Sequence, residues 1–253
     1  MIRGQDPGPD PLARRPFGST GIDVPAIAVG CAPLASMPEV FGYGVDEERA
    51  RATIGAALDS ELNYLDTAAS YGDGESERRI GLMLRERGGL LQGATLQTKI
   101  GAGPDGDFSG ETVRRRFERS LSLLGLDRVA VVFLHDPEHG GTGDSTEAAF
   151  AQAMATGGPV ETLRDLQAQG LIGHIGIAGG PVALMSRFVE TGWFAAIITH
   201  NRFTLLNRNS DPLLSTAAGR GMAVLNAAPF GGGLLSKGPE TFPATPTASR
   251  HLP

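Results

Sequence analysis

The sequence has few of the features that mark secreted, metal-clustered or membrane proteins. Its 253 residues include one cysteine, Cys31, so no disulfide framework and no cysteine metal cluster is expected. No apolar run approaches the ~20 residues that a membrane-spanning helix needs, and the first residues lack the apolar core of a signal peptide. We therefore expect a cytoplasmic protein in a reducing compartment.

A positive charge excess is also absent. The formal net charge is −6, which provides no general attraction to nucleic acid or to anionic membranes. We interpret the arginines at 114–116 and 119 as the solvated face of a helix and not as a binding patch. The expected partner is a small molecule, with no nucleic acid and no membrane, and the expected state is a monomer or homodimer.

Apolar runs and amphipathic stretches alternate along the chain. Short apolar runs without polar alternation are typical of strands buried on both faces, and strand–helix alternation favours parallel pairing. The runs begin near residues 26, 62, 95, 129, 174, 195 and 222. Helices are expected near residues 46–59, 75–87, 110–124, 159–169, 181–190 and 211–219, with Ser109 and Ser210 as N-caps.

The repeat spacing predicts an α/β fold, a (β/α)8 TIM-type barrel that is incomplete after the seventh strand. Successive runs are about 33 residues apart, as in such barrels. Three prolines after Lys237 argue against an eighth strand or helix, so we expect a truncated or naturally shortened chain. The predicted parts are a disordered lead (1–16), one barrel domain (17–237) and an irregular Pro/Thr-rich tail (238–253).

Two smaller features lie inside the predicted barrel domain. Residues 17–22 are typical of a tight hairpin, which could close the barrel floor. Residues 142–156 are expected to form an irregular insertion.

Four chemically capable side chains follow three of the predicted strands. Asp66 and Tyr71 come after one apolar run, Lys99 ends the next, and His135 ends the third. Because the carboxyl ends of parallel strands meet at one rim, these side chains are expected to lie together there. Each also has an ordinary structural interpretation, as a cap, a solvated lysine, a core histidine or a packed ring. Four matched strand ends favour a catalytic group.

Several fragments carry a family resemblance that covers residues 17–237. They are LDTAASYG at 65–72, SERRIG at 76–81, LHDPE at 134–138, and NAAPF at 226–230 before GLL at 233–235. The chain resembles the aldo-keto reductase superfamily, in the branch of sugar dehydrogenases that act on D-threo-aldoses, L-fucose and L-galactose, with pyridoxal dehydrogenases close by. The resemblance implies an NAD- or NADP-dependent oxidoreductase that converts an aldose to a lactone.

The resemblance also implies a role for each of the four side chains. Tyr71 transfers the proton while hydride moves at nicotinamide C4. A phenol with a pKa near 10 needs help at neutral pH, and the Lys99 ammonium would favour the phenolate. Asp66 would keep Lys99 charged, and His135 would position the substrate oxygen.

Cofactor contacts are implied for a second set of residues. His200 stands where many relatives have a glutamine that binds the nicotinamide carboxamide, and Ala178-Gly179 replaces a common Ser-Asn pair. The glycine-rich loop at 229–235 is either a pyrophosphate cradle or an ordinary strand-exit turn. The full implied set is Gly30, Cys31, Asp66, His200, Phe230, Gly231, Gly232 and Leu234.

Two other functions stay open at this point. The segment HDPEH at 135–139 resembles a metal-ligand cluster of a barrel hydrolase, but Pro137 disfavours a helical ligand pair, so no metal site is expected. A shortened relative could also be inactive, or could bind the cofactor as a sensor. The substrate pocket is expected above Tyr71, with residues 37–43 and 193–194 as candidate walls and Asp136 as a candidate hydrogen-bond partner.

Overall fold

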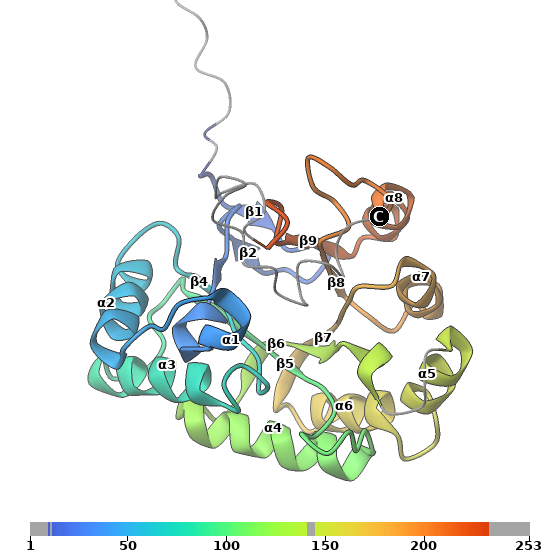
Figure 1. Ribbon diagram of the computed structural model, residues 1–253, viewed down its shortest axis with the longest axis horizontal. Coiled ribbons are helices and arrows are strands. Elements are labelled where there is room, and N and C mark those ends of the chain that lie inside the picture. Colours follow the sequence, from blue (N-terminus) through green and yellow to red (C-terminus); the bar gives the residue numbers. More distant parts are fainter. Residues whose placement is uncertain (1–9, 11, 141–144, 233–253) are drawn as a thin grey trace, which may run out of the picture.

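A curved sheet of seven parallel strands forms the frame of the molecule (Figure 1). The computed structural model describes residues 10, 12–140 and 145–232. Within them the strand order follows the chain from β3 to β9, which confirms the seven predicted strands and the incomplete barrel. The strands are β3 (Val29–Gly30), β4 (Tyr64–Asp66), β5 (Thr95–Ile100), β6 (Val129–His135), β7 (Ile172–Gly179), β8 (Ala196–His200) and β9 (Ala223–Ala227).

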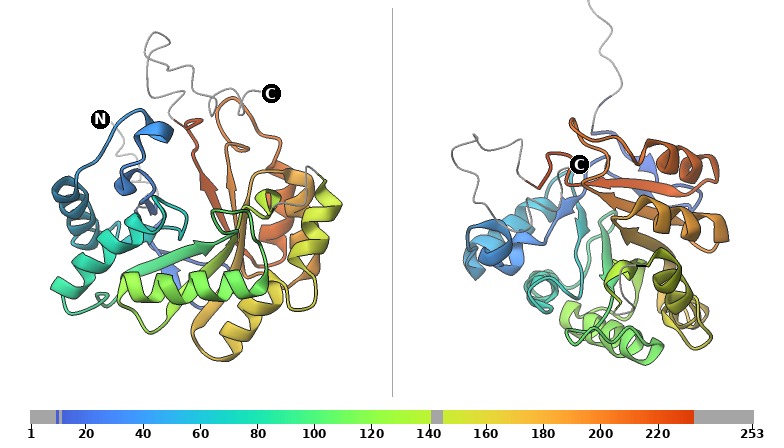
Figure 2. Two further views of the ribbon diagram at one scale, coloured as in Figure 1. Left: turned by 60° about the horizontal axis from the view of Figure 1, so that its bottom comes forward. Right: turned by 45° about the vertical axis from the view of Figure 1, so that its right-hand side comes forward.

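Helices connect successive strands and cover the outer face of the sheet (Figure 2). Each of the six predicted helices is present. They are α2 (Glu47–Leu58), α3 (Glu75–Glu86), α4 (Gly110–Leu124), α6 (Pro159–Ala168), α7 (Val182–Thr191) and α8 (Asp211–Gly219). Short turns of helix, η1 (Pro33–Ala35), α1 (Pro38–Phe41) and η2 (Pro137–His139), lie in the loops after β3 and β6.

Two local predictions need correction. The segment predicted as an irregular insertion contains helix α5 (Thr146–Ala153), because the Ser145 hydroxyl caps it by accepting from Ala148 N at 3.4 Å, and alanine-rich sequence favours helix. The predicted cap Ser109 accepts from Thr112 N at 3.2 Å. Ser210, in contrast, makes no cap bond, since its hydroxyl donates to Arg202 O at 3.0 Å instead.

An antiparallel hairpin closes the amino-terminal end of the sheet, as predicted. Strands β1 (Arg15–Pro16) and β2 (Asp23–Val24) flank it. Phe17 packs edge-on against Tyr64, with ring centroids 6.2 Å apart. A Cβ atom on Gly18 would lie 2.4 Å from Ala223 N, so only glycine fits this contact with β9. Arg15 and Pro16, assigned from the sequence to the irregular lead, thus belong to the hairpin.

The strands are buried on both faces. Along β6, Val131 and Phe133 point into the barrel, whereas Val132 and Leu134 belong to the larger cluster under the helices. All four are fully buried. Because each such side chain stabilises the fold by roughly 1.5–3 kcal/mol, this double burial explains the continuous apolar run in the sequence.

The two edge strands, β3 and β9, face each other across a cavity of about 890 Å³. Its lining includes Ile27, Val224 and Phe230, and it extends to Asp66 and Gly30. Among the described residues, no helix is long and apolar enough to cross a membrane. Leu234 and the predicted tail at 238–253 lie outside the described residues.

Candidate active site

A buried lysine joins three of the four predicted catalytic side chains. Lys99 Nζ donates to Asp66 Oδ2 at 2.6 Å, to Tyr71 Oη at 3.0 Å and to Thr67 O at 3.1 Å. The lysine is only 3% exposed. Its three donors therefore all have acceptors at the end of β4 or on the segment that follows it.

The strand register explains why these groups meet. In the parallel pair of β4 and β5, Asp66 lies opposite Gln97, and Lys99 follows two residues later on the same face. The chain after β4 stays beside β5, since Ala69 N donates to Lys99 O at 3.0 Å. A turn at Gly72, where φ is +59°, then directs Tyr71 back over the lysine.

Lys99 remains charged in this setting. Burial lowers the pKa of its ammonium, but the Asp66 carboxylate and the Tyr71 phenol more than offset that effect and raise the pKa above its usual value. Burial also raises the pKa of Tyr71, and Lys99 opposes this shift without cancelling it. Lys99 thus favours the phenolate, as expected, although desolvation leaves the pKa of Tyr71 above its usual value.

Two residues that the motifs did not reveal orient Asp66. Gln97 Nε2 donates to Asp66 Oδ1 at 2.6 Å, and the Tyr64 hydroxyl donates to Gln97 Oε1. Both residues are almost fully buried inside the barrel. The two-residue period of a strand was the available signal, because Tyr64 precedes Asp66, and Gln97 precedes Lys99, by two positions.

His135 lies beside Tyr71 at the end of β6. The two rings meet edge to face with centroids 5.9 Å apart, and His135 Nδ1 is 3.4 Å from Ser70 Oγ. Burial lowers the pKa of His135 to about 4, so its imidazole is neutral at pH 7. All four predicted side chains therefore share one rim of the sheet.

Asp136 connects His135 with the predicted cofactor residue His200. Its Oδ2 lies 3.5 Å from His135 Nε2, and its Oδ1 lies 3.6 Å from His200 Nε2. Burial opposes ionisation, but these imidazoles hold the pKa of Asp136 well below its usual range. Burial lowers the pKa of His200, yet the Asp136 carboxylate raises it above the ordinary histidine value. The backbone φ of Asp136 is +44°, a strained conformation for a residue other than glycine.

Glu138 belongs to the same group and was missed as a site residue. Its Oε1 accepts from Gly180 N at 2.8 Å. A Cβ atom on Gly179 would lie 2.9 Å from Glu138 Oε2, so the carboxylate fills space that a side chain at 179 would need. The replacement of Ser-Asn by Ala178-Gly179 was the available signal.

One oxygen each from Asp136 and Glu138 and one nitrogen from His200 lie within 4.8 Å of one another. Carboxylate and imidazole donors at such spacing could hold a divalent cation. His139, the last residue of the HDPEH segment, is outside this group, and its side chain is 69% exposed.

The other predicted cofactor residues lie at the ends of the edge strands. Gly30 pairs with Asp66, and Cys31 N donates to Asp66 O at 2.8 Å. The Cys31 side chain is fully buried, and burial raises the pKa of its thiol to about 12. With its thiol buried, its N–H donating to Asp66 O and its carbonyl accepting from Ser76 Oγ, Cys31 has no free polar group for a cofactor, contrary to the prediction.

After β9 the chain makes a turn in which Gly231 N donates to Ala228 O at 3.0 Å. Phe230 is 58% exposed, and Gly231 and Gly232 have φ values of +64° and +65°. Phe230 lines the same cavity as Gly30 and Asp66, so this turn faces the region between the edge strands. Glycine is favoured here because both residues adopt left-handed backbone conformations.

Comparisons with known proteins agree with this geometry. The Aldo/keto reductase family model matches residues 27–251. L-galactose dehydrogenase from Arabidopsis thaliana is 31% identical over 238 residues, which cover 92% of this chain and 70% of the relative. D-threo-aldose 1-dehydrogenase from a Pseudomonas species is 26% identical over 243 residues, 87% of this chain and 70% of the relative. The chain therefore belongs to the aldo/keto reductase family.

The fold of a solved relative agrees as well. A holo-form aldo-keto reductase from Bacillus halodurans matches with a TM-score of 0.71 and 24% identity, over 92% of this chain and 71% of that structure. The family membership confirms the expected class, an NAD(P)-dependent oxidoreductase, and the resemblance to the sugar-dehydrogenase branch.

Proposed function

We propose that this protein transfers hydride between a nicotinamide cofactor and the anomeric carbon of an aldose, with Tyr71 as the acid/base. The observation that supports this most is the 3.0 Å hydrogen bond from Lys99 Nζ to Tyr71 Oη beside the 2.6 Å bond to Asp66. It links the one phenol at this rim to a buried, permanently charged donor.

This arrangement defines how the proton is transferred. When a carbonyl is reduced, the Tyr71 hydroxyl gives its proton to the carbonyl oxygen as the carbon gains hydride. When a carbinol is oxidised, the phenolate takes the proton back, and Lys99 stabilises that anion at 3.0 Å. The bound nicotinamide supplies or accepts the hydride at C4.

His135 orients the substrate and does not supply the proton. Because its pKa is about 4, the ring is neutral at pH 7 and can donate one hydrogen bond and accept another. The edge-on contact of its ring with Tyr71, at 5.9 Å, supports a shared role of the two side chains at one reacting oxygen.

His200, Asp136 and Glu138 would hold the nicotinamide carboxamide. A charged His200 can donate to the amide oxygen, and the carboxylate oxygens can accept from the amide nitrogen. His200 Nε2, Asp136 Oδ1 and Glu138 Oε2 are buried atoms without a hydrogen-bond partner among the described residues, which suits such a ligand. Gly30, Phe230 and Gly232 would contact the rest of the cofactor through their backbones, whereas the N–H groups of Cys31 and Gly231 already donate to Asp66 O and Ala228 O.

The aldose assignment rests on the two sugar-dehydrogenase relatives and on the loop beside Tyr71. Phe41 and Tyr43 lie in this loop with ring centroids 6.3 Å apart, and an aromatic pair suits the apolar face of a sugar. The expected product of aldose oxidation at the anomeric carbon is a lactone.

Fluorescence titration with NADH and NADPH in parallel tests the cofactor first. We expect micromolar binding of at least one of them, followed by turnover of an aldose with the matching oxidised cofactor. Absence of binding by a chain with an intact circular dichroism spectrum would contradict the proposal.

Two observations support a second candidate, an inactive or cofactor-sensing relative. The edge strands β3 and β9 each pair with one strand among the described residues, and the cavity between them reaches Asp66. Cofactor binding without turnover of any aldose would favour this candidate. The group of Asp136, Glu138 and His200 could also hold a divalent cation that takes part in a reaction. Metal analysis after purification without chelators would test this.

A further inference from the structure

The loop between β3 and α2 packs against the turn that carries Tyr71. Gly72 N lies 3.2 Å from Met37 Sδ, close enough for a weak hydrogen bond to sulfur. A Cβ atom on Gly72 would lie 2.9 Å from the Cβ of Ala35. This loop, residues 31–46, thus touches Gly72, the residue directly after Tyr71. A shift of the loop would therefore displace the turn that carries Tyr71.

One buried guanidinium ties together the two ends of this loop. Arg79 Nη1 donates to Leu34 O at 2.7 Å and to Val45 O at 2.8 Å. Its Nε donates to Glu75 Oε1 at 2.7 Å, and the side chain is 9% exposed. Since Leu34 lies near the start of the loop and Val45 near its end, Arg79 holds the two ends of the loop together.

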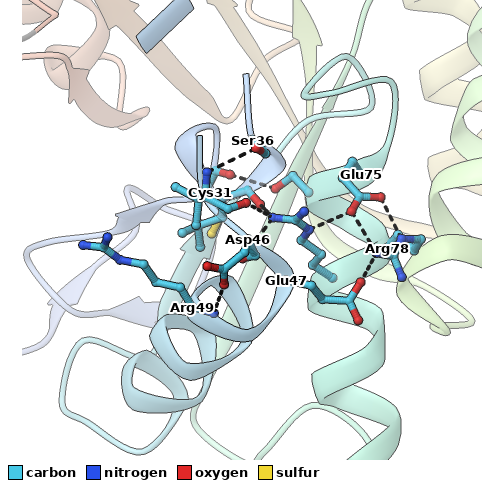
Figure 3. A network of polar contacts seen from close by, with 11 residues as sticks. Cys31, Ser36, Asp46, Glu47, Arg49, Glu75 and Arg78 are labelled. Atoms are coloured by element: carbon cyan, nitrogen blue, oxygen red, sulfur yellow. Dashed lines mark hydrogen bonds and ion pairs between the residues drawn. The ribbon is translucent and has the colours of Figure 1, made fainter. Parts of the chain in front are cut away.

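The same helical turn holds the start of the loop by a second contact. Ser76 Oγ donates to Cys31 O at 2.9 Å and accepts from Thr67 Oγ1 at 2.8 Å. Within the loop, Ser36 Oγ accepts from Val45 N at 3.1 Å. Figure 3 shows Cys31, Ser36 and Asp46 on one side of this network and Glu75 of α3 on the other.

The carboxylate of Glu75 balances the positive charge of Arg79. Hydrogen bonds from Arg78 and Arg79 lower the pKa of Glu75 to about 2, so its carboxylate is ionised at neutral pH. A guanidinium can donate hydrogen bonds to the loop carbonyls and to the carboxylate at the same time, because its N–H groups point in fixed, different directions. A lysine ammonium at this position lacks that geometry.

We infer that Arg79 is a positioning residue that fixes the β3–α2 loop over Tyr71 and so sets how tightly the substrate is held. This inference rests on the proposed function, because the loop is the proposed wall of the substrate pocket. Arg79 touches neither substrate nor the reacting atoms. Its loss loosens the loop while Lys99, Asp66 and their hydrogen bond stay in place.

The test compares Arg79→Lys and Arg79→Met with Arg85→Met. Arg85 lies on the same helix but is exposed, and within the described residues its side chain makes one long hydrogen bond, to Leu123 O at 3.4 Å. For both Arg79 variants we expect faster amide hydrogen exchange across residues 31–46 and a KM for the aldose raised by roughly tenfold or more. NADPH affinity and the exchange of β5 should match those of the parent, and Arg85→Met should change none of these quantities.

Different outcomes separate this inference from the proposed function. Unchanged exchange at 31–46 and unchanged KM in folded Arg79→Lys would overturn the positioning role. A second outcome would also overturn it. If kcat and cofactor affinity fall only in proportion to the fraction of folded protein, Arg79 is a purely structural residue. If the parent turns over no aldose, the proposed function fails, and hydrogen exchange with NADPH titration still decides whether Arg79 holds the loop.

Discussion

Lys99 holds Asp66 and Tyr71 at the same time, with its ammonium nitrogen 2.6 Å from the carboxylate and 3.0 Å from the phenol oxygen. A single buried cation therefore serves two different purposes. It is neutralised by an acid that Gln97 orients, and it stabilises the anion that forms when Tyr71 loses its proton.

Replacement of Tyr71 by phenylalanine tests the proton transfer. Removing the hydroxyl leaves the ring against His135 but takes away the acid/base, so kcat should fall by about 10²–10⁴. Cofactor affinity should change little, since no predicted cofactor contact involves the hydroxyl. Steady-state kinetics with NADH or NADPH titration of the same preparation provides the measurement. A kcat within a few-fold of the parent would remove Tyr71 from the mechanism.

Replacement of Lys99 by methionine tests the ion pair through stability. It leaves the Asp66 carboxylate, with 18% of its side chain exposed, without its cation, and breaking such a buried pair costs about 3–5 kcal/mol. Urea unfolding at pH 7 measures this loss. The double variant Asp66→Asn with Lys99→Met is the matched control, because it removes both charges and should recover part of the stability. Equal stability of the single and double variants would argue against a strong pair.

The convergence of Asp66, Tyr71, Lys99 and His135 could be predicted because each follows a strand in a parallel order, and strand ends share a rim. The contacts of Gln97, Glu138 and Arg79 could not be predicted in the same way. Their long-range contacts join residues 31 to 45 positions apart, such as Gln97 to Asp66 and Arg79 to Leu34. A strand period or a replaced motif pair can point to a position, but it does not record which partner the fold brings there.

The net rise in the pKa of Tyr71 could not be predicted for a related reason. A motif names the lysine beside the phenol but does not reveal how deeply both are buried, and here burial outweighs the lysine. The helix α5 was missed because its eight residues lack a clear apolar stripe, although Ser145 provides a cap.

The depressed pKa of His135 predicts a pH-dependent stability. Its pKa falls from 6.5 in the unfolded chain to about 4 in the fold, so the unfolded state binds more protons between these values. The contribution is present above pH 6.5 and is lost as the pH falls toward 4, by about 2 kcal/mol between pH 7 and pH 5.

Urea unfolding at pH 7 and pH 5 compares the parent with His135→Gln. The variant lacks the titrating imidazole, so its stability should fall less between the two pH values. NMR titration of the parent should place the His135 midpoint near 4. Identical pH dependence of the two proteins would mean that His135 titrates normally.

Replacement of Asp136 by asparagine tests how the two rim histidines are held. The carboxylate raises the pKa of His200, so its removal should lower that pKa and reduce the fraction of His200 that is charged. A neutral His200 donates at most one hydrogen bond, and NADH or NADPH should bind several-fold more weakly at pH 7.

The matched control for Asp136→Asn is His139→Gln. His139 Nδ1 also lies near Asp136, at 3.8 Å, but its side chain is 69% exposed. This variant should leave both the His200 titration and cofactor affinity unchanged. NMR titration of the histidines and fluorescence titration of the cofactor separate the two effects, because the first needs no cofactor.

If Asp136→Asn lowers the His200 pKa without weakening cofactor binding, His200 has no part in holding the nicotinamide. If neither quantity moves, the 3.6 Å contact between Asp136 and His200 carries no electrostatic coupling.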